Sequence, residues 1–262
     1  MLAKLIKYDL KFIYKQLIVF YIIIIALAIT ARLTTNFNDS SIFILAFIHR
    51  FCRVAVLGFG IGAVISGILR TWARFKFNVY GDESYLTQTL PIKRSTIWTA
   101  KFLSSVIMVL TTALVIILAL GIVFDIPAII TENATKTGNS TLTIIMTGAI
   151  FMLAVILQFI YTVQSGFLGI IIGHYFQNLQ TLWAIIFGYL IYIIGEIAIV
   201  AFCMLVWANF SPTVYDALYR SQFENLSTLN EILLGFNILY SLLIAISYYA
   251  SSKLLQHNFN VE

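Results

Sequence analysis

The sequence predicts an all-α integral membrane protein with six transmembrane helices. Of its 262 residues 61% are hydrophobic and only 10% are charged, and the charges leave several gaps long enough to cross a bilayer. A soluble domain has an apolar share of roughly 45 to 50%, and a helix that crosses the ~30 Å hydrocarbon layer needs about 20 apolar residues. Residues 1–262 are therefore interpreted as a single transmembrane domain.

The N-terminal segment, residues 1–15, is expected to form an amphipathic elbow helix at the membrane surface. On a helical wheel its lysines share one narrow arc and its apolar side chains spread over the other side. Those lysines are Lys4, Lys7, Lys11 and Lys15. Asp9 falls inside the apolar arc, which a positively charged anchor does not explain. The helix either only anchors the first span or also contacts a cytoplasmic partner.

Gaps between charges and one polar break predict the six spans. They cover about residues 16–34, 52–72, 101–124, 142–172, 181–208 and 232–253. The break, GHYFQNLQT at residues 173–181, divides a charge-free run that is too long for one helix. Pro91, Pro127 and Pro212 all fall outside the spans, which fits their lack of a backbone N–H.

The distribution of Lys and Arg predicts that both termini lie in the cytoplasm, because positive residues are retained on that side of a membrane. With the N-terminus inside, inner segments hold eleven of the sixteen basic residues and outer segments hold five. The net charge of +5 is thereby explained by orientation in membrane lipid, and no nucleic-acid partner is expected.

The longest polar interruption, YGDESYLTQTLPIKRSTIWTAK, covers residues 80–101 between the second and third spans, on the expected cytoplasmic side. A short helix is predicted here, since Asp82 or Ser84 can cap it. Leu86 and Leu90 lie four residues apart and share one face. A plain loop would need no such apolar face.

This segment resembles the corresponding part of bacterial type-2 ABC exporter permeases. Their segment commonly reads tyrosine-leucine-threonine, a few residues, leucine-proline, a basic pair, and then a span that opens with a lysine. The matching residues are Tyr85, Leu86, Thr87, Thr89, Leu90, Pro91, Lys93, Arg94 and Lys101. The six-span layout, the inside termini and the elbow are also similar over nearly the whole chain. In length and general sequence character the chain is similar to small family members that export antimicrobial or toxin-like peptides, such as the phenol-soluble modulin exporter.

The resemblance implies a coupling helix at about residues 81–94 that docks into a groove of a separate ATPase subunit. The implied docking residues are Asp82, Glu83, Ser84, Tyr85, Leu86, Thr87, Leu90, Pro91, Lys93 and Arg94. Two ATPase subunits and a second permease copy, or a sister permease, would complete the assembly in the bacterial cytoplasmic membrane. ATP and Mg would be used by the ATPase, and this chain is expected to bind no cofactor or metal itself.

The absence of a P-loop agrees with a transport subunit that has no catalytic residues. A P-loop reads G-x-x-x-x-G-K-[ST] and cradles phosphates with backbone N–H groups, but no Gly-Lys pair occurs in the sequence. Few charges lie along the spans, and the chain has 21 Phe and 14 Tyr. Such a path suits amphipathic or hydrophobic substrates, including peptides and lipids.

Glu196 is expected close to mid-membrane, where an ionised carboxylate costs at least ~2.5 kcal/mol. It either lines a path and meets a cationic substrate, or is a structural carboxyl that is protonated or hydrogen-bonded to a Tyr or Ser. Arg50 and Arg53 are possible partners if the second span tilts them inward. The alternative function is a proton-coupled secondary transporter that uses Glu196. That alternative predicts inverted repeats, and no convincing repeat is found in the sequence.

Two glycine pairs and two cysteines lie within the apolar part of the sequence. Gly58 with Gly62 is one G-x-x-x-G pair, and Gly169 with Gly173 is another. Such pairs allow close approach of two helices, either within the chain or at a dimer seam. The two cysteines stand in apolar settings without metal-like spacing, so they are interpreted as core thiols.

Overall fold

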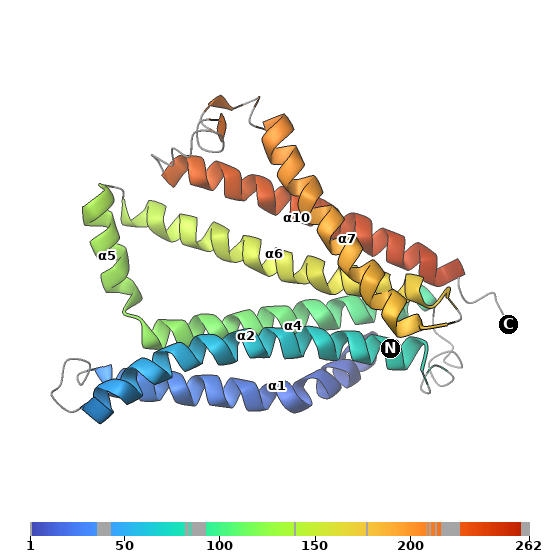
Figure 1. The fold of residues 1–262 in the computed structure, drawn as a ribbon, viewed down its shortest axis with the longest axis horizontal. Coiled ribbons are helices and arrows are strands. Elements are labelled where there is room, and N and C mark those ends of the chain that lie inside the picture. Colours follow the sequence, from blue (N-terminus) through green and yellow to red (C-terminus); the bar gives the residue numbers. More distant parts are fainter. Residues whose placement is uncertain are drawn as a thin grey trace. The chain divides into compact units, whose positions relative to one another are not determined.

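The fold is entirely helical in the residues that the structure describes. The computed structural model describes residues 2–35, 43–81, 84, 93–138, 140–176, 178–207, 209, 211, 212, 214, 215 and 226–257. Within these ranges seven α-helices occur, and a π-helical segment follows one of them (Figure 1). The elements are α1 (Leu2–Leu33), α2 (Phe43–Val79), α4 (Arg94–Val123), α5 (Ile126–Thr137), α6 (Thr141–Gly173), α7 (Gln180–Phe202), η2 (Cys203–Trp207) and α10 (Leu226–His257).

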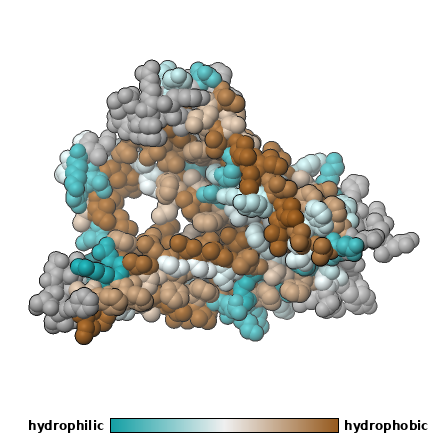
Figure 2. Space-filling model, viewed as in Figure 1, coloured by the Kyte–Doolittle hydropathy of each residue, from teal (hydrophilic) through white to brown (hydrophobic). Residues whose placement is uncertain are grey.

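Six of these helices are long and apolar enough to cross a membrane, which confirms the predicted number of apolar helices and indicates a multi-pass membrane protein. Their outer surfaces are apolar as well, and hydrophobic residues cover most of the visible face in Figure 2. Ile22, for example, is 63% exposed and Val54 is 70% exposed. Side chains of this kind are suited to lipid contact rather than to water.

Residues 2–15 and the first span form one continuous helix, α1, so the expected elbow is not a separate element among the described residues. The sequence contains no Gly or Pro between Leu2 and Leu33 that would interrupt the backbone hydrogen bonds. The four lysines are exposed, whereas Asp9, Ile13 and Leu17 are buried.

The helix α5 was not among the expected elements. It has 12 residues, apolar at the start and polar toward the end, so it lacks the long apolar run by which the spans were located. Pro127 occupies its first turn, where a missing backbone N–H does not disturb the helix. The bond between Lys136 and Glu132, 2.6 Å long, links two exposed side chains one turn apart.

The chain divides into two compact units, Met1–Ala128 and Ile129–Glu262. In the first unit α1 packs against both α2 and α4, which contact each other less. Small residues on all three helices let them approach: Ala28, Ala31, Ala63 and Ala119 are buried in one core with Ile24, Cys52, Val56 and Val123. Hydrogen bonds between Tyr14 and Thr111 and between Tyr21 and Thr112 add side-chain links from α1 to α4.

In the second unit α6 packs against both α7 and α10, and these two contact each other less. Gly169 and Gly173 lie against the backbone of α7, where a methyl group on either glycine would collide with Ala184. This confirms intramolecular packing for that glycine pair. The other pair is different, since Gly58 faces open space and Gly62 approaches the ring of Phe20 on α1.

Candidate functional site

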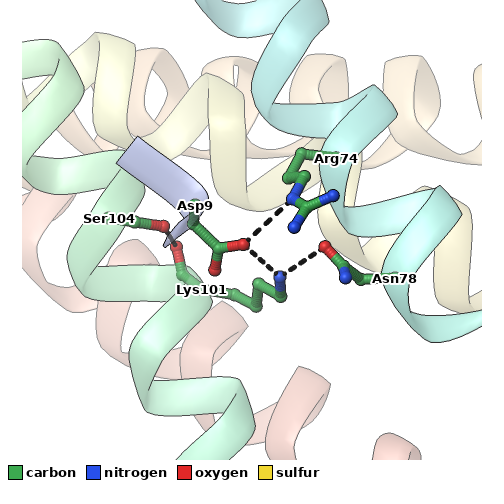
Figure 3. A network of polar contacts seen from close by, with 5 residues as sticks. All are labelled: Asp9, Arg74, Asn78, Lys101 and Ser104. Carbon is green, nitrogen blue, oxygen red and sulfur yellow. Dashed lines mark hydrogen bonds and ion pairs between the residues drawn. The ribbon is translucent and has the colours of Figure 1, made fainter. Parts of the chain in front are cut away.

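The first polar cluster joins the three long helices of the first unit (Figure 3). We define the Asp9 cluster as Asp9 of α1, Arg74 and Asn78 of α2, and Lys101 of α4. The Lys101 ammonium donates to Asp9 Oδ1 at 2.7 Å and to Asn78 Oδ1 at 2.9 Å. Arg74 Nε donates to the same Asp9 oxygen at 3.2 Å. One carboxylate oxygen therefore holds two cations from two other helices.

Two charged members of the Asp9 cluster are shielded from water, and this determines how the cluster affects stability. Asp9 is 3% exposed and Lys101 is 7% exposed. Buried charges lose hydration, and only close pairing and further hydrogen bonds offset that loss. The Arg74 guanidinium also lies 5.0 Å from the ring centre of Phe12, a cation–π arrangement that helps to hold the second positive charge. Removal of the Asp9 carboxylate would take from Lys101 and Arg74 the anion that pairs with both of them.

The Asp9 cluster lies beside both ends of the segment 82–92. Asn78 is in the last turn of α2, and Lys101 is in the second turn of α4. An aromatic contact reinforces the same place, because the Phe75 ring packs edge-to-face on Trp98 with centroids 5.8 Å apart. The two helix ends are thus fixed to each other and to α1 by buried charge and by ring packing.

Most of the predicted docking residues lie outside the described residues, namely Asp82, Glu83, Tyr85, Leu86, Thr87, Leu90 and Pro91. Of the others, the Ser84 backbone N–H donates to the Gly81 carbonyl at 2.8 Å. Lys93 immediately precedes α4 and Arg94 begins it, and both are exposed. The coupling helix itself therefore stays a prediction.

The surroundings of Asp9 explain why it interrupts the apolar arc of its helix. The carboxylate points at Lys101 and Arg74 of the same chain, which gives it a structural role between three helices. The sequence pattern singled out Asp9 but not its partners. The signal that could have found Lys101 is its place at the start of an apolar span, where a lysine is buried only if a carboxylate meets it.

The second polar cluster lies inside the second unit. We define the Glu196 cluster as Glu196 and Tyr192 of α7, Tyr161 of α6 and Tyr240 of α10. The Tyr240 hydroxyl donates to the carboxylate of Glu196, 2.9 Å from Oε2 and 3.2 Å from Oε1. The Tyr161 ring stacks on that of Tyr192 with centroids 6.1 Å apart and lies 6.2 Å from that of Tyr240. Glu196 thus has the tyrosine partner that its structural interpretation expects.

A glycine next to Glu196 makes the arrangement possible. A methyl group on Gly195 would occupy the position of the Tyr161 hydroxyl. Without that methyl group the hydroxyl reaches the α7 backbone and donates to the Ile191 carbonyl at 2.8 Å. Apolar side chains, including Ile199 and Leu157, pack around the rings. The cluster is consequently one carboxyl group in aromatic and aliphatic surroundings.

The arginines considered as partners of Glu196 have other contacts or are exposed. Arg53 lies over the ring of Phe124, 4.8 Å from its centre, and Arg50 is exposed. Within the described part of the chain Glu196 makes no ion pair. The described residues also contain no group of three His, Cys, Asp or Glu side chains that could hold a metal ion. Cys52 and Cys203 are buried free thiols, as expected.

The fold, with six long apolar helices in the part of the chain that the structure describes, indicates a helical multi-pass membrane protein. No family model, no curated protein and no solved structure matches the chain.

Proposed function

We propose that the chain is the permease subunit of an ATP-driven exporter of the ABC type. It moves amphipathic or hydrophobic substrates, cytolytic or antimicrobial peptides among them, out of a bacterial cell. The observation that carries this proposal is the Asp9 cluster beside the segment 82–92. A cytoplasmic segment can transmit movement into membrane helices only if its ends are firmly attached to them. The buried charges supply such an attachment to α1, α2 and α4.

The energy source in this proposal is a separate ATPase. The absence of a Gly-Lys pair leaves the chain without a P-loop, so ATP and Mg are handled by two partner ATPase subunits. Residues 82–94 dock on them, with Leu86 and Leu90 as the apolar face. A second permease copy or a sister permease completes the path, and both termini lie in the cytoplasm.

Docking is tested by placing a charge on the apolar face. We expect Leu86→Asp and Leu90→Asp to abolish co-purification with the ATPase encoded beside the chain, because a carboxylate in an apolar groove loses its hydration. The measurement is the yield of ATPase retained on the affinity-tagged permease in detergent.

The matched control for docking is Ile129→Asp. Ile129 is an exposed apolar residue of α5, 43% exposed, and its replacement introduces the same charge in an element outside the segment 82–94. This variant should retain the ATPase. Normal retention by both leucine variants, with normal folding, would contradict docking through residues 82–94.

One structural observation favours the alternative, a proton-coupled secondary transporter that uses Glu196. Each unit contains three of the six apolar helices, and in each the first helix packs against both others. A three-helix pattern used twice is what an inverted-repeat transporter would contain. The two functions differ in their energy source, so transport driven by ATP or by a proton gradient distinguishes them.

A further inference from the structure

We infer that the Glu196 cluster is a binding site for an organic cation, a primary ammonium or guanidinium group. The assignment of that cation to the transported molecule rests on the proposed export function, and it would narrow the substrates to positively charged amphipathic molecules. The inference itself depends on three features of the cluster: an uncompensated carboxyl group, the rings around it, and the chemistry of its surroundings.

The carboxyl group has no positive partner among the described residues. Its hydrogen bonds come from the Tyr240 hydroxyl, which carries no charge. Glu196 also lies within a helix long and apolar enough to span a membrane, where an ionised carboxylate costs at least ~2.5 kcal/mol. A cation that reaches Glu196 recovers this cost as a charge pair in a medium of low dielectric constant. The site thus favours a positively charged ligand over a neutral one.

The rings add a second attraction for the same kind of ligand. Tyr161, Tyr192 and Tyr240 come from three different helices and lie in contact, with Tyr240 joined directly to the carboxylate. The face of an aromatic ring attracts ammonium and guanidinium groups, and carboxylates pair with both. Ring positions are fixed from outside the cluster, since Gly195 leaves room for Tyr161 and the Ile191 carbonyl holds its hydroxyl.

The composition of the cluster also selects the type of cation. A metal ion would need several oxygen, nitrogen or sulfur ligands, and the described residues contain no group of three His, Cys, Asp or Glu side chains that could supply them. One carboxylate with aromatic neighbours suits an organic cation that carries apolar groups, because Ile199, Leu157 and Leu243 can contact those groups. The physical alternative is a protonated carboxyl that only holds α7 to α10, and the experiment is designed to separate the two.

The test uses the purified full chain in nanodiscs of uncharged phosphatidylcholine. The probes are dansyl-labelled dodecylammonium and its N-acetyl analogue, which has nearly the same shape but no charge. Fluorescence titration, with the signal of empty nanodiscs subtracted, gives the two affinities. We expect the cation to bind the wild type at least tenfold more tightly than the analogue. Glu196→Gln should remove that preference and leave binding of the neutral analogue unchanged.

Three further variants keep the test decisive. Glu132→Gln, which removes an exposed carboxylate of α5, should bind the cation like the wild type. Tyr240→Phe keeps a ring beside the carboxylate and should retain most of the affinity, whereas Tyr240→Leu should lose several-fold. Equal binding of the two probes by the wild type, or an unchanged cation preference in Glu196→Gln, would overturn the inference. The assay contains no ATPase, so it succeeds or fails independently of ATPase docking.

Discussion

At the scale of single residues, the most informative position is Asp9. Its carboxylate is buried, and one of its oxygen atoms pairs with both Lys101 and Arg74. This oxygen therefore links three helices of the first unit. A buried ion pair is weak grounds for net stability, because apolar side chains of similar size often serve as well. Its effect is to make the carboxylate the critical member, because Lys101 and Arg74 both pair with it. The same logic does not apply to the exposed Lys136–Glu132 pair, which water and salt screen.

Asp9→Asn should destabilise the first unit strongly. The amide has the shape of the carboxylate but not its charge, so the buried ammonium of Lys101 and the partly exposed guanidinium of Arg74 would lose the carboxylate that pairs with both. Removal of one member of a buried pair costs about 3 to 5 kcal/mol. The measurement is the free energy of unfolding by SDS in mixed micelles.

The comparison for Asp9→Asn is Glu132→Gln, the same type of change at an exposed pair on α5. Its effect should be no more than about 0.5 kcal/mol. If the two variants unfolded with the same free energy, the Asp9 cluster would not be the anchor described here.

At the scale of helices, the contact between α6 and α7 depends on glycine. Gly169 and Gly173 lie where any side chain would meet the backbone of α7 rather than a movable side-chain end. Backbone cannot shift aside locally, so a larger residue must separate the two helices along their length. The Glu196 cluster lies between the same helices and α10, so its geometry depends on this close approach.

Gly169→Ala should weaken the packing of α6 on α7 by about 1 to 3 kcal/mol, the typical cost of an overpacked interior. Gly148→Ala is the matched control, since Gly148 lies on the same helix with nothing near its would-be methyl group. It should leave stability unchanged or raise it, because alanine favours helix. SDS unfolding measures both variants, and a loss of stability in Gly148→Ala alone would contradict the account.

At the scale of the whole molecule, the sequence predicts the long apolar helices because that information is local. Runs of apolar residues between charges are long enough to see without tertiary structure, so all six apolar helices were found. The helix α5 was missed because its 12 residues mix apolar and polar side chains and contain no apolar run long enough to span a membrane. The full length of α1 was also missed. The lysine-rich residues 1–15 have the pattern of a separate helix on the membrane surface, whereas residues 2–15 continue directly into the first span.

Partners across helices could not be predicted in the same way. The wheel placed Asp9 on the buried face, but nothing local indicates that Lys101, 92 positions away, meets it. Glu196 was likewise found by its charge, and a tyrosine partner was expected in kind, whereas Tyr240 was identified only by the packing of α10 on α6 and α7. Pairing of distant side chains is decided by how helices pack, which one sequence does not specify.

The most direct test of the central claim is the energy source of transport. The chain is reconstituted in vesicles with the ABC ATPase proposed as its partner, and movement of a fluorescent amphipathic cationic peptide is recorded. We predict transport that requires ATP, continues without a proton gradient, and is lost in the Leu90→Asp permease. Transport by the chain alone, driven by a proton gradient and abolished by Glu196→Gln, would contradict the claim and support the secondary transporter instead.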